Sequence, residues 1–259
     1  MNEEQGKNRL FSSDYYVKKY SEVRNKRSDL FESEKYFIPR CLSPGKSLLD
    51  IGCAVGGFSE ILHDYEETIE YFGVDVSEEM IIRAKEKYPD LSFRAIDCVN
   101  SMEFEDSAFH LVQSWGVTVH EPEYRELLKE SWRVCSEILI FDMRLKMTPD
   151  EYLDKEVSYT LNPGGVKYHY VVANIYDFIQ FLIDLKPVPG IIEMYGYEAA
   201  PNKFSFVPED FGSIFMFGIA IYKNNNQVGK SIDIKLNVPD GIRKNLEDFL
   251  TNKDVSISG

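Results

Sequence analysis

The amino-acid sequence predicts an α/β fold with a mostly parallel sheet. Between residues 47 and 142, short apolar runs alternate with segments of helical periodicity. This alternation is typical of strand–helix–strand units with right-handed crossovers and helices on both faces of the sheet. A turn rich in small residues follows the first apolar run, and open sheets of this kind bind ligands at the carboxyl ends of their strands.

The alternating region contains the predicted strands and helices in regular order. The strands are predicted at residues 47–51, 71–74, 91–95, 109–114 and 138–141, and the helices at residues 58–65, 77–88 and 121–134. Ser77 is a favourable N-cap for the second of these helices, and Pro89 ends it shortly before the next strand.

The pattern changes after the last of these strands. Residues 144–170 have no clear period and contain the turn Asn162-Pro163-Gly164-Gly165. Residues 171–185 are apolar over a helical length and end at a segment with two prolines, 186–190. Two further strands are predicted at 191–197 and 213–222, followed by an alternating edge strand at 231–238 and a terminal helix at 242–250.

Length and composition indicate a globular protein. With 259 residues, 44% of them hydrophobic, the chain can bury a core as one large domain, or as one domain and a smaller subdomain. The longest apolar run, 214–222, is far shorter than the roughly 20 residues of a membrane-spanning helix. Residues 1–7 lack the apolar stretch of a signal peptide. We therefore expect a cytoplasmic protein with no membrane partner.

The charge distribution disfavours nucleic acids as partners. The net charge is −14 and the pI is near 4.8, so the summed field repels polyanions. One basic cluster, with acidic residues interleaved, forms either a solvated helix face, which we expect, or a contact for phosphate or nucleic acid. Its basic residues are Lys18, Lys19, Arg24, Lys26 and Arg27, and the acidic ones are Asp14, Glu22 and Asp29.

Neither a disulfide framework nor a metal site is indicated. The four cysteines, Cys41, Cys53, Cys98 and Cys135, include no Cys-x-x-Cys pair, which favours reduced thiols. No histidine pair or carboxylate cluster has the spacing of a metal site, so we expect no bound metal.

The turn after the first strand fits two kinds of ligand site. Gly52, Ala54 and Gly57 satisfy a relaxed dinucleotide pattern, whereas Asp50, Gly52 and Gly56 fit a pattern in which an acidic residue closes the strand. Small residues let the backbone approach a ligand, and the exposed N–H groups favour an anion. A carboxylate at position 50 repels a pyrophosphate but suits a ligand with an ammonium group.

This stretch and those after it resemble the class I S-adenosylmethionine-dependent methyltransferases. Residues 48–56, Leu-Leu-Asp-Ile-Gly-Cys-Ala-Val-Gly, are similar to the first motif of that family, with Ala54 where glycine is more frequent. Residues 71–77 are similar to the second strand with its acidic end, and 95–98 to the segment near the adenine. Residues 109–114 resemble the fourth strand, with His110 in place of aspartate, and 137–142 resemble the fifth.

The resemblance implies an architecture. We expect a Rossmann-like α/β fold with a seven-stranded, mostly parallel sheet, the last strand antiparallel, and N-terminal helices and an insertion that form a lid. Residues 1–46 would form a helical cap and 47–223 the methyltransferase core, with the lid at about 144–170. Residues 224–259 would add a strand and a helix.

The resemblance also implies a site for S-adenosylmethionine. Asp75 would accept hydrogen bonds from the ribose hydroxyls, or would only complement the following helix dipole. Asp97 would lie near the adenine amino group, and Asp50 near the methionine ammonium. Met80 would pack on the adenine or in the core. The implied site comprises Asp50, Gly52, Cys53, Ala54, Gly56, Asp75, Val76, Met80, Asp97, Cys98, Ser114 and Trp115.

Two tyrosines upstream extend this expectation. Tyr16 and Tyr20 share one face of an N-terminal helix. Some family members cover the cofactor with such a helix, so these side chains would contact the donor or acceptor, or would only pack. An acidic residue at position 75 also suits NAD-binding folds, but Asp50 and Asp97 favour the adenosyl donor.

His120 is the candidate catalytic base. It follows the fourth strand, beside which the transferred methyl group would lie, and imidazole exchanges protons near neutral pH. A purely structural role is the alternative. His169 is a second candidate base, His63 and His110 are expected to be structural, and Asp142 alone would match the magnesium-dependent branch of the family.

The sequence therefore predicts methyl transfer from S-adenosylmethionine to a small-molecule acceptor. The acidic surface disfavours RNA and DNA, and the aromatic content suits a partly apolar pocket. The acceptor, and whether an oxygen, nitrogen or carbon atom is methylated, stay open. The alternative is a catalytically silent subunit that binds S-adenosylmethionine, because Ala54 and His110 depart from the family pattern.

Overall fold

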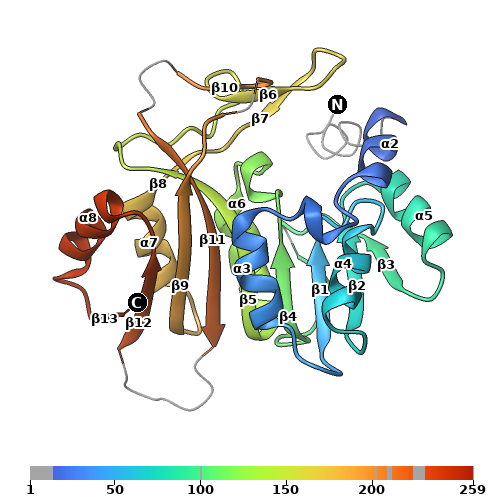
Figure 1. Ribbon diagram of the computed structural model, residues 1–259, viewed down its shortest axis with the longest axis horizontal. Coiled ribbons are helices and arrows are strands. Elements are labelled where there is room, and N and C mark those ends of the chain that lie inside the picture. Colours follow the sequence, from blue (N-terminus) through green and yellow to red (C-terminus); the bar gives the residue numbers. More distant parts are fainter. Residues whose placement is uncertain (1–13, 100, 202, 209–211, 224–230, 259) are drawn as a thin grey trace. The chain divides into compact units, whose positions relative to one another are not determined.

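The computed structural model in Figure 1 describes residues 14–99, 101–201, 203–208, 212–223 and 231–258. The expectation about residues 1–7 lies outside this range. By their contacts, the residues form two compact parts, which we describe separately. The first part comprises Met1–Trp115 and Glu126–Ser136, and the second Gly116–Arg125 and Glu137–Gly259. Within the described ranges, every helix is too short or too polar to cross a membrane.

The first part contains the predicted parallel strands. Its strands are β1 (Ser47–Ile51), β2 (Glu70–Asp75), β3 (Ser92–Ala95) and β4 (Phe109–Ser114). Their order is β3-β2-β1-β4, and each neighbouring pair is parallel. Figure 1 shows the four arrows side by side. The crossover order places the carboxyl ends of β1, β2 and β4 at one edge.

The helices of this part begin and end close to the predicted positions. They are α4 (Phe58–Tyr65), α5 (Glu78–Lys87) and most of α6 (Tyr124–Val134). The Ser77 side chain accepts a hydrogen bond from the Met80 N–H, as expected of an N-cap. Helix α6 begins after Pro122, later than predicted, because a 3-10 turn, η2 (Thr118–His120), precedes it.

The basic cluster is not one solvated helix face. Helix α2 (Asp14–Glu22) ends before Arg24, and η1 (Arg27–Asp29) and α3 (Glu32–Cys41) follow. Arg24 has φ +66° and forms an ion pair with Glu34, which is buried. Its guanidinium also lies 5.1 Å from the centroid of the Phe58 ring. The expectation of a fully solvated cluster is therefore wrong for Arg24, whose charge is compensated inside the fold.

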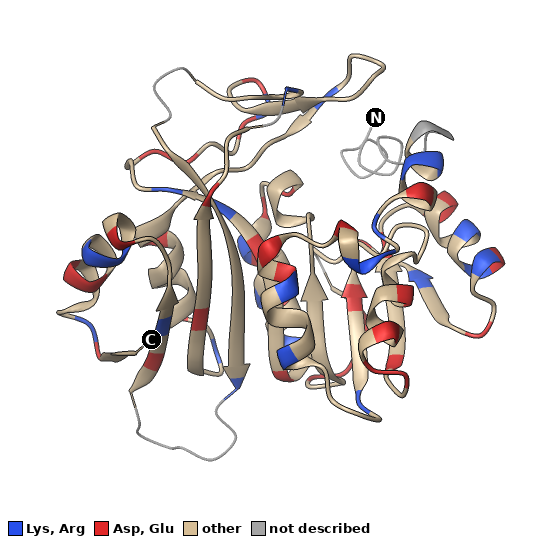
Figure 2. Ribbon diagram, viewed as in Figure 1, with Lys and Arg blue, Asp and Glu red and all other residues tan. Residues whose placement is uncertain are grey.

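Elsewhere the charged surface is mixed in sign. Figure 2 shows acidic and basic residues together on α3, α5 and α8 (Asp240–Leu250). The described part of each of these helices therefore presents no purely basic face.

The second part contains a mixed sheet with the order β5-β11-β9-β12-β13. The strands are β5 (Cys135–Lys146), β9 (Pro189–Glu198), β11 (Ile214–Lys223), β12 (Ile232–Asn237) and β13 (Val255–Ser258), and β8 (Ala173–Asn174) also pairs with β5. Strand β11 runs antiparallel to both β5 and β9. The α/β fold with a mostly parallel sheet and an antiparallel strand beside the fifth is thus confirmed. Four strands in the first part and six here exceed the expected seven.

Three predictions about this part are wrong in detail. Strand β12 is not an edge strand, because β13 pairs with its outer side. The helix expected over 171–185 is α7 (Ile175–Ile183), because Asn174 caps it by accepting hydrogen bonds from the Tyr176 and Asp177 N–H groups. The helix at 242–250 is not terminal, because β13 follows it.

The region without clear period forms a small sheet of its own. Strands β6 (Tyr159–Leu161), β7 (Lys167–His169) and β10 (Ser205–Phe206) are antiparallel in the order β10-β6-β7. The turn at 162–165 joins β6 to β7, as a hairpin connection does.

Candidate functional site

The turn after β1 uses residues in the left-handed region. Gly52, Ala54 and Gly56 have φ values of +76°, +48° and +78°. Glycine adopts this conformation without strain, whereas alanine there costs about 1 to 2 kcal/mol. A Cβ atom on Gly56 would lie 2.8 Å from the Phe93 ring. The turn therefore needs glycine at position 56 for both conformation and space.

Asp75 fastens this turn to the end of β2. Its Oδ2 accepts a hydrogen bond from the Ala54 N–H at 3.0 Å, and its Oδ1 accepts one from the Ser77 N–H at 2.9 Å. Each carboxylate oxygen keeps a second lone pair. Burial raises the pKa of Asp75, and the two backbone hydrogen bonds oppose that rise. The carboxylate thus holds the turn open and still has acceptor capacity.

Asp50 lies at the centre of a buried hydrogen-bond chain. Its Oδ2 accepts from the Tyr71 hydroxyl at 2.7 Å, and its Oδ1 accepts from Gln113 Nε2 at 2.9 Å. Gln113 Oε1 in turn accepts from Trp115 Nε1 at 3.3 Å. Burial raises the pKa of Asp50 to about 6, although the two side-chain hydrogen bonds oppose the shift. Asp50 therefore changes charge close to physiological pH.

Tyr71 and Gln113 were missed in the sequence analysis. Both lie in predicted strands, on β2 and β4, the two neighbours of β1. The one signal that pointed to them was a polar side chain within an otherwise apolar strand, and it does not specify a partner. The strand register supplies that information, since Asp50 pairs with Gln113 across β1 and β4.

The other residues of this part that were predicted to bind S-adenosylmethionine lie next to the carboxyl ends of the parallel strands or on α5. Gly52 and Cys53 donate their N–H groups to the Val74 carbonyl at 2.8 and 3.0 Å. Asp97 is half-buried and accepts from the Val99 N–H at 3.1 Å. Val76 is half-buried, and Met80, Cys98 and Trp115 are buried. All four cysteines are free, as expected, and burial raises the pKa of Cys53 and Cys98.

Three polar atoms of this part are buried without a hydrogen-bond partner among the described residues. They are Ser114 Oγ, at the end of β4, Asn25 Oδ1, in the segment after α2, and Ser33 Oγ, on α3. Asn25 lies next to the turn, since a Cβ atom on Gly57 would be 3.5 Å from the Asn25 Cβ. Orphaned polar groups of this kind are rare in proteins and suit a site that a polar ligand completes.

The two predicted tyrosines of α2 stack on each other. The Tyr16 and Tyr20 ring centroids are 6.1 Å apart, and Tyr16 is buried. The Tyr20 carbonyl would lie 3.7 Å from a Cβ atom on Gly57. The helix that carries these tyrosines therefore reaches the turn after β1.

His120 and His169 are in the second part and are linked to each other. His120 Nδ1 lies 2.8 Å from the His169 carbonyl oxygen, and the His120 ring packs edge-on against Tyr168. Because a carbonyl only accepts, Nδ1 carries the proton, and Nε2 holds the lone pair in the neutral ring. His169 Nδ1 is bonded to the Leu153 carbonyl at 2.7 Å. The His120 ring is thus oriented by its backbone partner.

Asp142 anchors the segment that carries His120. It is buried, its Oδ1 accepts from the Gly116 N–H at 2.7 Å, and its Oδ2 accepts from Arg144 at 2.5 Å. The Thr118 hydroxyl donates to the Asp142 carbonyl. The described residues contain no group of three or more histidine, cysteine or acidic side chains arranged to hold a metal ion. Both Asp142 carboxylate oxygens accept hydrogen bonds from other residues of the chain. This geometry does not support a role for Asp142 as a magnesium ligand.

The donor-side residues fit an adenosyl ligand in their chemistry. The first part contains three features of such a site. They are the remaining acceptor capacity of Asp75, the unpartnered oxygens of Ser114 and Asn25, and the small residues of the turn. A ligand with hydroxyl and ammonium groups would satisfy these acceptors. A pyrophosphate would instead meet the Asp50 and Asp75 carboxylates.

Comparisons with known proteins agree with this description. A family described as "Methyltransferase domain" matches residues 48–137. The chain is 35% identical over 96 residues to 2-methyl-6-phytyl-1,4-hydroquinone methyltransferase of Synechocystis, a match that covers 36% of this chain and only 30% of that protein. It is 28% identical to carboxy-S-adenosyl-L-methionine synthase of Helicobacter pylori, over 69% of this chain and 81% of that one.

A solved structure shows the same fold. The phosphoethanolamine N-methyltransferase 2 of Haemonchus contortus, solved in complex with S-adenosyl-L-methionine, superposes with a TM-score of 0.61 at 14% identity, over 87% of this chain and 60% of that one. S-adenosylmethionine is the methyl donor typical of the matched family. Residues 48–137 of the chain thus match a methyltransferase domain.

Proposed function

We propose that this chain transfers the methyl group of S-adenosylmethionine to a small-molecule acceptor. The observation that carries the proposal is the double hydrogen bond of Asp75, which fixes the glycine turn of β1 against the acidic end of β2. This arrangement leaves the remaining lone pairs of the Asp75 carboxylate beside a turn of small residues, at the sheet edge where open parallel sheets bind ligands.

The donor-side residues have separate proposed roles. Asp75 accepts from the ribose hydroxyls through its remaining lone pairs. Asp50, already held by Tyr71 and Gln113, places its charge near the methionine ammonium. Asp97 lies near the adenine amino group, and Met80 and Cys98 supply apolar surface. Tyr16 and Tyr20, on α2, cover the ligand.

The bound donor supplies an electrophilic methyl group on sulfur, so the protein mainly has to align the acceptor and exclude water. A base is needed where the acceptor must lose a proton. We assign this role to His120, because its Nδ1–H is fixed by the His169 carbonyl and its Nε2 is then the basic atom.

A small-molecule acceptor agrees with the charge and with the relatives. The net charge of −14 opposes polyanionic substrates. The Synechocystis relative is, by its name, a methyltransferase of a hydroquinone. The oriented His120 imidazole is compatible with methylation of an oxygen, a nitrogen or a carbon atom of the acceptor.

The similarity to the Helicobacter pylori synthase supports a second candidate, a reaction that modifies the donor itself. That match covers more of both chains than the match to the Synechocystis protein. Mass spectrometry of the nucleoside product separates the two, because methyl transfer leaves S-adenosylhomocysteine whereas the synthase named in the comparison forms carboxy-S-adenosylmethionine. A silent binding subunit would leave the donor unchanged with any acceptor pool.

Replacing Asp75 tests the donor site. We expect Asp75→Ala to weaken S-adenosylhomocysteine binding in calorimetry far more than Asp142→Ala, since two charge-assisted hydrogen bonds of about 1.5 to 3 kcal/mol each are lost. Ser77→Ala is the matched control, because it removes the cap of α5 and leaves the Asp75 carboxylate in place. Equal loss in Ser77→Ala would show that the effect comes from a disturbed start of α5 and not from loss of the Asp75 carboxylate. Chelation of magnesium should change nothing, and a loss that matches Asp142→Ala would refute the metal-free assignment.

The raised pKa of Asp50 predicts a pH dependence of donor binding. As the pH falls through about 6, Asp50 takes up a proton and loses the charge that attracts the ammonium. Binding titrations between pH 5 and pH 8 should therefore show that the affinity for S-adenosylhomocysteine decreases about tenfold for each pH unit below the pKa of Asp50. Asp50→Asn should bind more weakly at neutral pH, without this decrease. Parallel profiles for both proteins would remove Asp50 from the donor site.

Replacing His120 tests the base. His120→Ala should lower the turnover number by about 100-fold or more and leave donor affinity nearly unchanged, because proton transfer is lost only in the transition state. His169→Ala is the control, since it keeps the backbone carbonyl that orients His120. A melting temperature that falls together with activity, or equal losses in both variants, would indicate a structural role for His120.

A further inference from the structure

Lys146, the last residue of β5, is a buried cation without an anionic partner among the described residues. Its side chain is fully buried, and its Nζ has no hydrogen-bond partner among the described residues. Its Nζ lies 3.6 Å from the centroid of the Tyr152 ring. A cation–π contact compensates only part of the cost of removing an ammonium group from water.

The contrast with Arg144, two residues earlier on the same strand, is informative. Alternate residues of a strand point to one face, and Arg144 has its counter-ion there, since Asp142 accepts at 2.5 Å. At Lys146 the two strand neighbours are Ile214 of β11 and Asn174 of β8, and neither is acidic. Among the described residues, the half-buried Arg144 therefore has a counter-ion and the buried Lys146 has none.

Asn174 is not available to fill this role. Its Oδ1 already accepts from the Tyr176 and Asp177 N–H groups, and its Nδ2 donates to the Thr148 carbonyl at 2.7 Å. The Thr148 hydroxyl is a second buried polar group without a hydrogen-bond partner among the described residues. Two unsatisfied donors thus lie two residues apart in the chain, and each could serve the same acceptor group.

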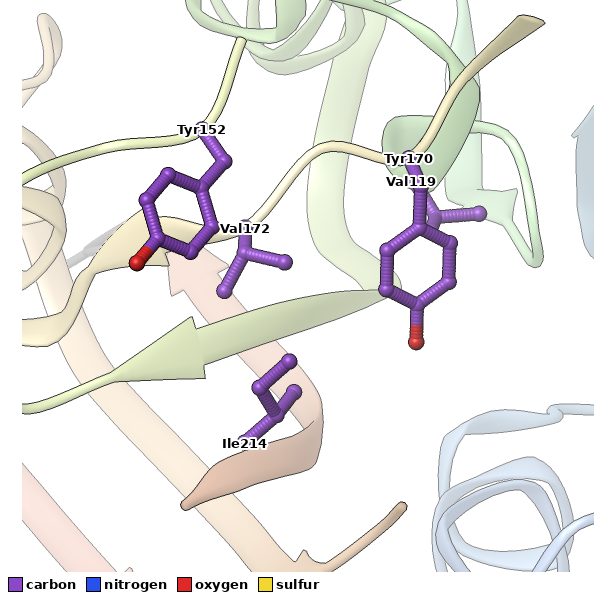
Figure 3. Packing of buried hydrophobic residues seen from close by; sticks show 5 residues of the cluster. All are labelled: Val119, Tyr152, Tyr170, Val172 and Ile214. Carbon is purple, nitrogen blue, oxygen red and sulfur yellow. The ribbon is translucent and has the colours of Figure 1, made fainter. Parts of the chain in front are cut away.

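The surroundings of Tyr152 are apolar and connect to the His120 segment. Figure 3 shows the buried cluster of Val119, Tyr152, Tyr170, Val172 and Ile214. Val119 directly precedes His120, and its carbonyl accepts from the Val171 N–H at 2.7 Å. A ligand group that reaches Lys146 would therefore be flanked by an apolar surface next to the proposed base.

We propose that Lys146 and Thr148 bind the carboxylate of an acceptor that has an apolar body. That the ligand is a methyl acceptor rests on the proposed function. The anion site itself rests on Lys146 Nζ and Thr148 Oγ1, which have no hydrogen-bond partner among the described residues. A single ammonium and one hydroxyl match a monoanion, and the apolar cluster matches the rest of such a molecule. The Tyr152 ring covers Nζ in this structure, so the carboxylate enters when that ring turns aside.

Benzoate is a suitable probe, and benzamide is its neutral isostere. We expect calorimetry on the full chain, saturated with S-adenosylhomocysteine, to show saturable benzoate binding at millimolar concentration and at least tenfold weaker binding of benzamide. Lys146→Met should weaken benzoate binding at least tenfold without lowering the melting temperature, because it replaces an unpaired buried charge by an apolar chain of similar length. Lys167→Met, on a half-exposed lysine paired with Glu156, should bind benzoate as the wild type does.

Thr148→Val supplies a second test that does not depend on the lysine, and a threefold or greater loss of benzoate affinity is expected. Equal benzoate binding in wild type and Lys146→Met, absence of saturable binding, or tighter binding of inorganic phosphate would each overturn the proposal. The S-adenosylhomocysteine titration on the same sample separates the failures. Donor binding without benzoate binding overturns this inference alone, and benzoate binding without donor binding overturns the proposed function alone.

Discussion

The hydrogen bonds of the Asp75 carboxylate are the constraint on which the rest of the donor-side structure depends. One carboxylate, at the end of β2, accepts from the Ala54 N–H on one side and the Ser77 N–H on the other. It therefore fixes the turn after β1 and the start of α5 at the same time. Ala54 tolerates its left-handed conformation because this bond offsets part of the strain.

Charges buried in this chain are compensated by specific partners in three places. Asp50 is held by Tyr71 and Gln113, Glu34 by Arg24, and Asp142 by Arg144 and the Gly116 N–H. A buried charge without such partners is costly. Each of these carboxylates also fixes a segment near a proposed functional residue. Burial of charge thus positions the turn, the N-terminal segment and the His120 segment.

Lys146 differs from these groups, because no described residue forms a hydrogen bond with its ammonium group. Natural chains seldom retain an uncompensated buried charge unless something outside the folded chain completes it. A carboxylate brought by the acceptor would complete both Lys146 and Thr148. Both groups proposed for the acceptor, His120 and Lys146, belong to the second part.

Local patterns in the sequence predicted much of the fold. Strands β1 and β4 and helix α4 have the predicted bounds, because each is a clear apolar run with a turn or cap beside it. Strand β5 is longer than predicted, since the charged residues Asp142, Arg144 and Lys146 hide a strand whose polar side chains are buried. Strand β13, a short polar segment, was missed because only its pairing with β12 makes it a strand.

The site was predictable to a similar degree. The turn and the acidic strand ends follow a recognisable order in the sequence, so Asp50, Asp75 and Asp97 were found. The partners of Asp50 were not, because Tyr71 and Gln113 come from other strands and only the register brings them together. Lys146 was missed for the same reason, since burial and the lack of a partner are properties of the folded chain.

Titration calorimetry with S-adenosylhomocysteine and, separately, with NADH tests the central claim most directly. The order of Asp50, the glycine turn, Asp75 and Asp97 predicts saturable binding of S-adenosylhomocysteine in the micromolar to submillimolar range, and no comparable binding of NADH. Tight binding of NADH, with no heat from S-adenosylhomocysteine, would contradict the account and assign the turn after β1 to a dinucleotide.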